Sequence, residues 1–537
     1  MQCWSSSFKY IISSGLKLIW KRSFWEKAQE YGSKTAIVSR KNNYSYHQLL
    51  RDAKQKALLL AGGKDLEQAR VAVLVPPSYA YVSWQWAIWL SGGVFVPLSP
   101  SHPQEELEYF VRDAEATHIV VSAEFQDKLT QLAGEYCLPY LRVSPVDGSL
   151  LMGSERKKPN VDTIEFPVID KKRNAMIIYT SGTTSRPKGV LYTHDMIEAQ
   201  IKSLVEAWQW TSSDHILNVL PLHHVHGIVN VVCCALYSGA TLEMMEKFQA
   251  QPVWERWMLN LIPQGSHISL FMAVPTIYHR LIQMYDAAPP GIQPLLSDAA
   301  KSLRLFVSGS AALPETTFHR WKAITGHLIL ERYGMTEVGM ALSNPLKEEE
   351  RRPGWVGYPL PGVQVQLKDE ESNQWITEKA GRGELLIKGP NVFREYWNRP
   401  KATAAAFEKG YFLTGDIAQR DESGFYQIIG RSSVDIIKSG GYKLSALEIE
   451  RVYLQHPAIQ QCTCVGIKDD EWGESVGLVI VLKDGQGDDV SLEELREWGK
   501  DKLAPYKLPK KVKVVKEIPV NAMGKVQKKQ VAQEMFG

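Results

Sequence analysis

The sequence has few of the features that mark secreted, membrane-spanning or nucleic-acid-binding proteins. Its six cysteines include no CxxC pair, which argues against a disulfide framework or a zinc site and favours a reducing compartment. No apolar run approaches the roughly 20 residues that a membrane span needs. With 62 basic and 59 acidic residues, the formal net charge is only +3. A charge this small gives no general attraction to nucleic acid or to anionic membranes.

Acidic residues are also missing from the first 25 positions, which carry four basic residues and six serines. Apolar residues such as Phe8, Ile12 and Ile19 share one helical face, and Lys9 and Lys17 lie toward the other. This pattern is typical of a mitochondrial transit peptide, although arginine is scarce. We therefore predict a transit segment at residues 1–23 and location in the mitochondrial matrix. A frayed tail on a cytoplasmic protein is the alternative.

The 537 residues are enough for several core-forming units. Up to about residue 430, β-prone apolar runs alternate with helical patterns, which predicts a layered α/β architecture. The expected helices are 103–116 and 313–326, both with proline near the start and acids in the first turn. The expected strands lie at 70–75, 92–99, 117–122, 174–180, 214–222, 240–245 and 267–275.

Two further changes of pattern divide the chain. After about residue 357, short strands at 358–369, 381–389, 410–421 and 424–431 alternate with glycine or charged turns and predict a β-rich subdomain. From about residue 432, two helical and two strand-like runs predict a small α+β domain. We thus expect a large N-terminal domain at 24–430, a hinge at 431–434 and a mobile C-terminal domain at 435–537.

The run "YTSGTTSRPKGV" at 179–190 crowds hydroxyls, glycines and Lys188 into one loop. A buried strand precedes it, and a helix is expected from about Asp195. A strand, a small-residue loop and a helix make a phosphate cradle, because converging N–H groups and hydroxyls bind anions. No Ser or Thr follows the lysine, so this is not the GxxxxGK[ST] motif. A polar surface turn is the alternative for the loop taken alone.

Four more runs occur in a fixed order with the loop: "ERYGMTE" (331–337), "YFLTGD" (411–416), "IIGRSSVDIIKSGGYKLSALEIE" (428–450) and "PVNAMGKVQKK" (519–529). Together the five resemble the adenylate-forming superfamily of acyl-CoA synthetases, luciferases and peptide-synthetase adenylation domains. The resemblance covers nearly all of residues 24–537. It implies that ATP activates a carboxylic acid as an acyl-adenylate, which a thiol such as CoA then attacks.

The resemblance also implies roles for individual residues in ATP and magnesium binding. Thr336 and Glu337 would lie at the α-phosphate and Mg²⁺, with Thr184 also near the metal. A hard cation needs oxygen ligands, and phosphate oxygens supply the rest. The residues expected to bind ATP are Thr180, Ser181, Gly182, Thr183, Thr184, Ser185, Arg186, Pro187, Lys188, Tyr333, Asp416, Arg431 and Lys525. Asp416 would accept hydrogen bonds from the ribose hydroxyls, with Arg431 beside it.

Lys525 would reach the α-phosphate and the attacking carboxylate during adenylation, where a fixed ammonium favours the transition state. The C-terminal domain would then turn about the hinge and bring the Ser439–Lys443 loop to the thiol channel. The alternative to a catalytic role is that Lys525 lies on a solvated basic face, since eight lysines occur between 507 and 529. Two positions depart from the family pattern: Ser185 stands where relatives often have glycine, and Ser433 where many have Asp or Lys.

The expected acid-binding residues are Arg332, Arg280, His224, His226 and Ser310. Many monocarboxylate synthetases have a small residue where this chain has Arg332, and a buried guanidinium without a partner is unfavourable. A second substrate carboxylate would be that partner, and an apolar tail would be rejected. Pairing of Arg332 with an internal glutamate is the alternative, and a hydrogen-bonded core role is the alternative for either histidine.

The runs "HHVHG", "SGSAALP" and "ERYGMTEVGMALSNPL" closely resemble malonyl-CoA synthetases of the mitochondrial acyl-CoA synthetase family member 3 type. The expected activity is therefore ATP- and Mg²⁺-dependent ligation of malonate, or of methylmalonate, to CoA. The first rival is a medium- or long-chain fatty acyl-CoA synthetase. A peptide-synthetase unit and a non-catalytic nucleic-acid binder using "KLPKKVKVVK" are less favoured. Small molecules are the expected partners, and no oligomeric state is implied.

Overall fold

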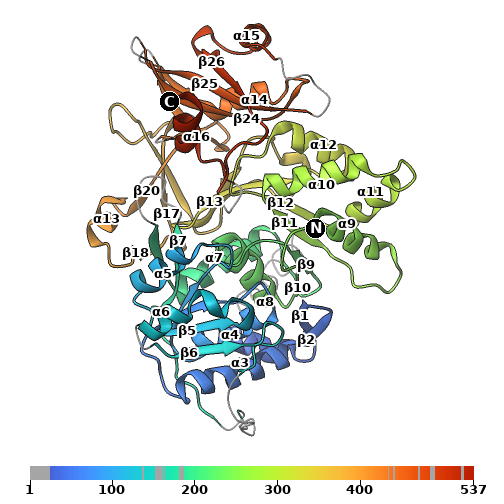
Figure 1. The fold of residues 1–537 in the computed structure, drawn as a ribbon, viewed down its shortest axis with the longest axis vertical. Helices are drawn as coiled ribbons and strands as arrows, with labels where there is room; N and C mark the ends of the chain where they lie inside the picture. Colours follow the sequence, from blue (N-terminus) through green and yellow to red (C-terminus); the bar gives the residue numbers. More distant parts are fainter. Residues whose placement is uncertain are drawn as a thin grey trace, which may run out of the picture.

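The computed structural model describes residues 24–135, 138–151, 161, 164–180, 187–432, 434–439, 442–469, 472–483, 490–521 and 525–537. Figure 1 shows the early sheets and helices at one end and the C-terminal strands at the other. The predicted transit segment at 1–23 lies outside the described residues. Among the described residues, no helix combines the length and hydropathy that crossing a membrane requires.

One sheet contains both strands that flank the predicted phosphate loop. Its order is β6-β5-β3-β4-β7-β8-β18. Pairing is parallel from β6 to β7, and then β8 runs antiparallel to both β7 and β18. The strands are β3 (Arg70–Leu74), β4 (Val94–Pro97), β5 (His118–Ser122), β6 (Tyr140–Val143), β7 (Asn174–Thr180), β8 (Lys188–Thr193) and β18 (Glu395–Tyr396).

Helices of this region include α3 (Tyr46–Ala61), α4 (Tyr79–Leu90), α5 (Gln104–Asp113) and α6 (Thr130–Glu135). Every residue of α4 is buried, as its sequence "YAYVSWQWAIWL" requires, because a helix that is apolar on all sides has no solvent face. The predicted helix at 103–116 corresponds to α5. Its first turn carries Glu105 and Glu106, which the helix dipole favours.

A second sheet has the order β2-β1-β10-β9-β11-β12-β13-β14-β15. Its strands are β1 (Thr35–Ser39), β2 (Asn42–Ser45), β9 (His215–Asn218), β10 (Thr241–Met244), β11 (Leu270–Ala273), β12 (Leu305–Ser308), β13 (Leu330–Met335), β14 (Gly339–Ser343) and β15 (Tyr358–Pro359). The central strands pair in parallel, and their ends carry the "SGS" and "ERYGMTE" runs. Together the two sheets confirm the layered α/β prediction.

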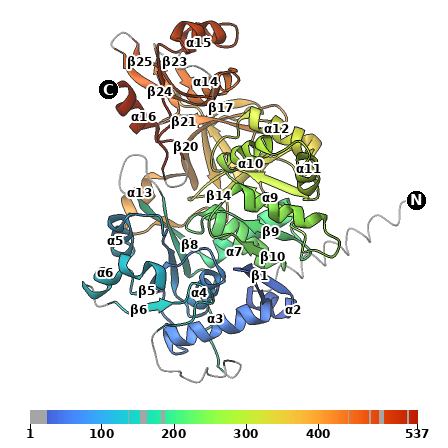
Figure 2. The same cartoon turned by 45° about the vertical axis from the view of Figure 1, so that its right-hand side comes forward.

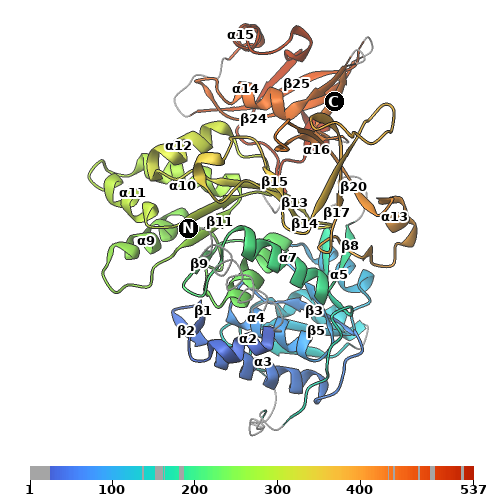
Figure 3. The ribbon, with the colours of Figure 1, turned by 180° about the vertical axis from the view of Figure 1, so that it is seen from behind.

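The helices of this second unit are α2 (Phe24–Tyr31), α7 (His194–Ala207), α8 (Cys234–Ser238), α9 (Ala250–Met258), α10 (Pro275–Ala287), α11 (Gln293–Lys301) and α12 (Glu315–Thr325). Figure 3 shows α9 to α12 gathered beside β11. A fully buried π-helix at His226–Cys233 begins at the last histidine of the "HHVHG" run. Such π-helical turns are rare and often occur at functional sites.

The predicted β-rich subdomain is confirmed. Its sheet contains β16 (Gln364–Lys368), β17 (Gly381–Lys388), β19 (Phe407–Glu408), β20 (Tyr411–Arg420) and β21 (Tyr426–Arg431), all antiparallel. Helix α13 (Pro400–Ala405) follows β18. Figures 1 and 2 both place β17 and β20 between the N-terminal sheets and the C-terminal strands.

The C-terminal region has hydrophobic clusters of its own, formed from residues between Ile437 and Phe536. This agrees with a small α+β domain, while the exact boundaries at 430 and 435 stay predictions. Its elements are β22 (Ile436–Ser439), β23 (Tyr442–Ser445), α14 (Ala446–Tyr453), β24 (Ile459–Asp469), β25 (Gly473–Leu482), α15 (Leu492–Gly499), β26 (Lys511–Val514) and α16 (Lys528–Phe536).

One expectation about the phosphate loop is wrong. A strand, β8, stands between the loop and helix α7, so the loop joins two antiparallel strands rather than a strand and a helix. Thr180 pairs with Lys188 at the mouth of this hairpin. The β-branched and aromatic residues of "KGVLYT" favour the extended conformation. The dipole of α7 therefore does not begin at the loop, and any anion there must rely on the loop itself and on Lys188.

Candidate active site

The base of the predicted phosphate loop is held on both strands. The Thr180 hydroxyl donates to the Lys188 carbonyl at 3.4 Å, and the Tyr109 hydroxyl donates to the Pro187 carbonyl at 2.7 Å. The Lys188 ammonium lies 4.2 Å from the centroid of the Tyr396 ring. The remaining predicted ATP-binding residues of the loop lie outside the described residues: Ser181, Gly182, Thr183, Thr184, Ser185 and Arg186.

The turn between β13 and β14 brings Thr336 close to β8, the strand that follows this loop, and Glu337 close to Tyr396. The Tyr192 hydroxyl, from β8, donates to the Thr336 carbonyl. The Glu337 carboxylate is buried and accepts from the Tyr396 hydroxyl at 2.8 Å. Burial raises the pKa of the Glu337 carboxyl, and Tyr396, Arg431 and Lys188 act against that rise. The two predicted phosphate- and metal-binding elements thus meet around one tyrosine.

The donor set around Glu337 suits a magnesium ion that is shared with a nucleotide. Among the described residues, no group of three or more His, Cys, Asp or Glu side chains could hold a metal by itself. Mg²⁺ is commonly bound by one or two carboxylates together with substrate phosphates and water. A single buried carboxylate beside a phosphate loop fits that pattern, because the cation would offset the unfavourable burial of the negative charge.

The predicted ribose site is assembled from three strands. Asp416 of β20 pairs with Arg431 of β21, and the Arg431 guanidinium lies 3.1 Å from the Asp416 carboxylate. The Tyr333 hydroxyl of β13 donates to the same carboxylate. Burial raises the pKa of the Asp416 carboxyl, while Arg431, Tyr333 and Lys525 oppose the rise.

Lys525 therefore lies close enough to Asp416 to act on it, although the two are more than 100 residues apart in the sequence. The charge of Lys525 also lowers the pKa of Asp435, although burial and Lys528 are larger influences there. The Lys525 backbone N–H donates to the Asn521 side chain at 3.0 Å, and the side chain is exposed. The C-terminal domain thus presents this lysine to the predicted nucleotide site.

Lys528 does not belong to the solvated basic face that is the alternative for Lys525. Its ammonium is largely buried and lies 2.7 Å from the carboxylates of both Asp435 and Glu450. Burial alone would lower the pKa of Lys528, but the two carboxylates raise it above the usual range. Asp435 in turn accepts from the Arg431 backbone N–H at 3.0 Å. This buried triad joins the start of α16 to the segment beside the predicted hinge. Ser433 itself, and residues 440–441 of the expected thiol-channel loop, lie outside the described residues.

Arg332 is the most unusual side chain of the site. It is 3% exposed, and none of its three guanidinium nitrogens has a hydrogen-bond partner among the described residues. The internal glutamates of the alternative have other partners: Glu331 accepts from the Gly354 N–H at 2.8 Å, and Glu337 accepts from the Tyr396 hydroxyl. Burial lowers the pKa of the Arg332 guanidinium to about 9.

The structure also shows why the guanidinium can lie where it does. A Cβ added to Gly309 would come within 2.3 Å of its central carbon, so only glycine leaves room for it. His226, from the π-helix, is near enough for the Arg332 charge to lower its pKa, after the larger effect of burial. The His226 ring contacts the Ser310 hydroxyl at 3.4 Å. Ser310 has a backbone φ of 70°. Residues other than glycine seldom adopt this conformation, and it often occurs at functional sites.

The remaining predicted acid-binding residues occupy different environments. His224 is half-buried, its Nε2 atom is buried and unpaired among the described residues, and desolvation lowers its pKa to about 4. Arg280 is exposed on α10, and no hydrogen bond or ion pair joins it to another described residue. Its role as a second carboxylate contact stays a prediction. Tyr278, two residues earlier on α10, is buried, and its hydroxyl donates to the Val307 carbonyl at 2.9 Å.

Sequence reasoning missed two residues that organise the site: Tyr396 and Gly309. Gly309 had a visible signal, because it lies between two serines in the "SGS" run, directly after the apolar residues that form β12. Tyr396 had no local signal, since its contacts come from strands that are distant in the sequence.

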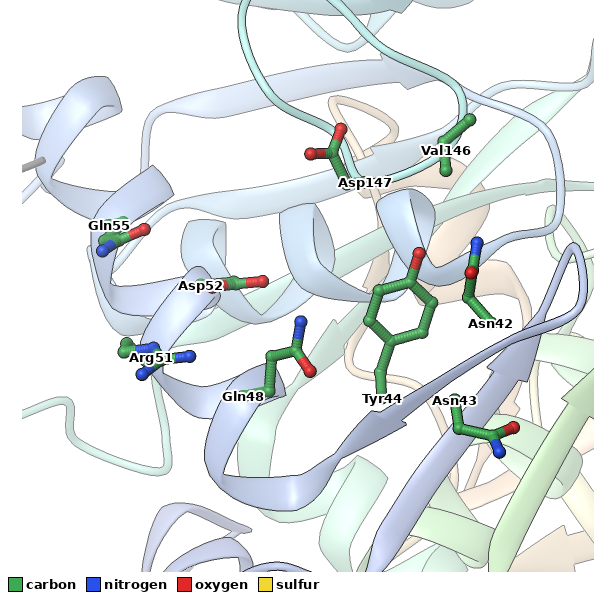
Figure 4. A pocket seen from close by; sticks show the side chains of 9 residues that line it. All are labelled: Asn42, Asn43, Tyr44, Gln48, Arg51, Asp52, Gln55, Val146 and Asp147. Atoms are coloured by element: carbon green, nitrogen blue, oxygen red, sulfur yellow. The ribbon is translucent and has the colours of Figure 1, made fainter.

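A separate surface pocket lies beside β2, α3 and the 146–147 turn, far in sequence from these residues (Figure 4). Polar side chains line it, among them Gln48, Arg51 and Asp147. The Tyr44 ring lines the pocket and stacks on the Tyr79 ring, with 3.6 Å between the ring centroids. It contains none of the predicted site residues.

Comparison with known proteins agrees with this site. Residues 24–397 match the AMP-binding enzyme family, and residues 448–525 match the AMP-binding enzyme C-terminal domain. The mitochondrial malonate–CoA ligase of Mus musculus is 43% identical over 536 residues, covering 95% of this chain and 90% of the relative. The malonate–CoA ligase of Arabidopsis thaliana is 39% identical, covering 97% and 90%. ATP-bound MatB from Rhodopseudomonas palustris superimposes with a TM-score of 0.83 at 30% identity, covering 95% of this chain and 98% of that chain. With its nucleotide motifs gathered at one junction and both family regions matched, the chain belongs to the AMP-binding enzymes, the adenylate-forming superfamily that its sequence resembles.

Proposed function

We propose that this protein is an ATP-dependent malonate–CoA ligase, which forms malonyl-AMP and then malonyl-CoA, AMP and pyrophosphate. The prediction of an AMP-forming acid–thiol ligase is confirmed by the family matches and by malonate–CoA ligases that match nearly the whole chain. ATP and CoA are the co-substrates of that reaction.

The single observation that carries the choice of acid is the unpaired Arg332 guanidinium. A buried cation with no protein partner is strongly unfavourable unless a ligand supplies the counter-charge. The far carboxylate of a dicarboxylic acid can do so with two parallel hydrogen bonds. A fatty acyl tail would leave the guanidinium buried and unpaired, which favours malonate over octanoate. Methylmalonate has the same two carboxylates and stays the close alternative.

The reacting end of malonate would lie toward Lys525 and the ATP phosphates. In the first step, a carboxylate oxygen bonds to the α-phosphorus, and the bond from that phosphorus to the bridging oxygen of pyrophosphate breaks. In the second step, the CoA thiolate attacks the acyl carbonyl, and AMP leaves. Lys525 would offset the negative charge that gathers on the α-phosphate. Asp416, with Arg431 and Tyr333 around it, would accept from the ribose hydroxyls.

Glu337, with Thr336 beside it, would hold a Mg²⁺ ion shared with the ATP phosphates, and Thr184 would lie close to the same ion. The ion would supply charge neutralisation on the phosphate oxygens during displacement. Lys188, at the start of β8, would bind the same phosphates. The proposal for the metal is supported by the single buried carboxylate at the mouth of the phosphate loop.

The proposal extends to the motion and location of the protein. Between the two steps, the C-terminal domain would turn about residues 431–434, carrying Lys525 away and bringing the Ser439–Lys443 loop inward. The described arrangement, with Lys525 near Asp416, corresponds to the first step.

We also propose the mitochondrial matrix as the location of the protein. The acid-free, serine-rich N-terminus and the mitochondrial ligase of Mus musculus support this.

The test is AMP release by the purified protein with ATP, Mg²⁺, CoA and one acid at a time. Malonate should be turned over far faster than acetate or octanoate. The rate with methylmalonate shows whether the site has room for a methyl group on the central carbon. Octanoate turnover equal to malonate turnover would refute the dicarboxylate proposal and favour a fatty acyl-CoA synthetase. A second test is fusion of residues 1–23 to a fluorescent protein, which should direct it to mitochondria.

A further inference from the structure

Tyr396 lies between the two charged groups of the proposed ATP site. It forms the end of β18, is 5% exposed, and pairs with Val190 on the strand that leaves the phosphate loop. Its hydroxyl donates to the Glu337 carboxylate at 2.8 Å. The face of its ring holds the Lys188 ammonium 4.2 Å from the centroid. One neutral side chain therefore touches both the proposed metal ligand and the proposed phosphate-binding lysine.

The backbone around Tyr396 fixes this arrangement from both sides. The Phe393 N–H donates to the Glu337 carbonyl at 2.7 Å, and the Trp397 N–H donates to the Gly189 carbonyl at 2.8 Å. The Tyr396 N–H itself donates to the Thr403 hydroxyl at 3.0 Å. Residues 393–397 thus bond to the Glu337 turn at one end and to the residue after Lys188 at the other. The position of the phenol is set by β18, not by its own contacts alone.

The chemistry of a phenol suits the gap between these charges. Lys188 and Glu337 already act on each other electrostatically. Without a group between them, the ammonium and the carboxylate would be free to form a direct ion pair, which ATP and Mg²⁺ would then have to break. A tyrosine offers a hydroxyl donor to the carboxylate and a negative ring face to the ammonium, so each charge has its own partner.

We infer that Tyr396 is a positioning residue of the ATP site, which keeps Glu337 and Lys188 separate and oriented until nucleotide and metal bind. The inference rests on the proposed ATP-dependent function. The Tyr396 hydroxyl acts through Glu337, so it affects the Mg²⁺-dependent part of ATP binding. The Tyr396 ring acts through Lys188, so it affects phosphate binding with or without metal.

The two halves of the inference can be tested by calorimetric titration of ATP in Mg²⁺ and in EDTA, without turnover. Tyr396→Phe keeps the ring and removes the hydroxyl, so ATP affinity should fall about tenfold in Mg²⁺ and less than about twofold in EDTA. In a Glu337→Gln background the same change should have little further effect, because the hydroxyl acts through that carboxylate. Tyr396→Leu removes the ring as well and should weaken ATP binding under both conditions.

The matched control is Tyr285→Phe. Tyr285 also has one hydroxyl contact, with Ser297 at 3.1 Å, and one guanidinium over its ring, that of Arg320 at 5.9 Å. It lies on α10, outside the proposed ATP site, so ATP affinity should not change. The KM for malonate at saturating ATP should be unchanged in Tyr396→Phe, since the acid site is intact.

Wild-type ATP affinity in Tyr396→Phe at every Mg²⁺ concentration would overturn the inference. So would an equal loss in Mg²⁺ and EDTA, or full additivity with Glu337→Gln, because the hydroxyl would then act on something other than Glu337. Failure of the unmodified protein to bind ATP at all would instead refute the proposed function. The outcomes of the two proposals are therefore distinguishable.

Discussion

Replacing Arg332 with methionine is the most direct test of how the acid is chosen. Methionine keeps a long unbranched side chain and removes the guanidinium. Truncating one partner of a buried, hydrogen-bonded charge pair typically costs about 2–5 kcal/mol, which corresponds to a factor of about 30 to 4,000. We expect kcat/KM for malonate to fall within that range, while octanoate, which no longer faces an unpaired cation, gains relative to malonate.

The same substitution should stabilise the ligand-free protein. Burial lowers the pKa of the guanidinium from 12.5 to about 9, which indicates several kcal/mol of desolvation at about 1.4 kcal/mol per pKa unit. Among the described residues, no hydrogen bond offsets it. Replacing poorly compensated buried charges with apolar side chains often raises stability by about 1–4 kcal/mol. The expected signature is thus lost activity together with increased free energy of unfolding.

The assay compares AMP release and chemical denaturation for Arg332→Met and for a control, Arg351→Met. Arg351 is also buried, but its guanidinium donates to the carbonyls of Pro345, Leu328 and Leu346. Its removal leaves those acceptors unpaired and should destabilise the protein by about 2 kcal/mol or more. Malonate turnover within threefold of the unmodified protein would refute the reasoning about substrate. A loss of stability matching that of Arg351→Met would refute the reasoning about the unpaired charge.

Three further predictions concern other parts of the site. Lys525→Ala should slow malonate-dependent pyrophosphate exchange at least about 100-fold, yet leave thioester formation from supplied malonyl-AMP largely intact; equal losses in both would contradict a role confined to the first step. Lys528→Met leaves Asp435 and Glu450 as buried charges without their cation, so the C-terminal domain should lose about 3–5 kcal/mol, measurable by hydrogen exchange in α14 and α16. The folded pKa of His224 is about 4 and its unfolded value about 6.5, so the unfolded state binds more protons between these values. Stability should therefore fall by about 2 kcal/mol per such histidine from pH 7 to pH 5, and His224→Gln should remove that part of the loss in urea unfolding at the two pH values.

The sequence was most informative where function depends on a short run of residues. The loop before Lys188 and the "ERYGMTE" run predict an ATP site from short runs alone, because phosphate and metal binding need several donors close together in the chain. It was least informative where partners are distant. Nothing near Lys528 reveals that it is buried between Asp435 and Glu450, and its charged neighbours indicate a solvated face instead. The π-helix and Tyr396 were missed for the same reason, since packing rather than local pattern determines both.

In the proposed function, the distribution of charge along the acid site would favour dicarboxylic over monocarboxylic acids. Arg332 is the cation at one end and Lys525 the cation at the other, in the proposed function. His224 and His226 are kept neutral by burial, and the charge of Arg332 further disfavours protonation of His226. In the proposed function, a dicarboxylic acid would therefore meet one positive charge at each end. A monocarboxylic acid can satisfy only one of the two, so its binding leaves a buried cation unpaired, whatever the shape of its tail.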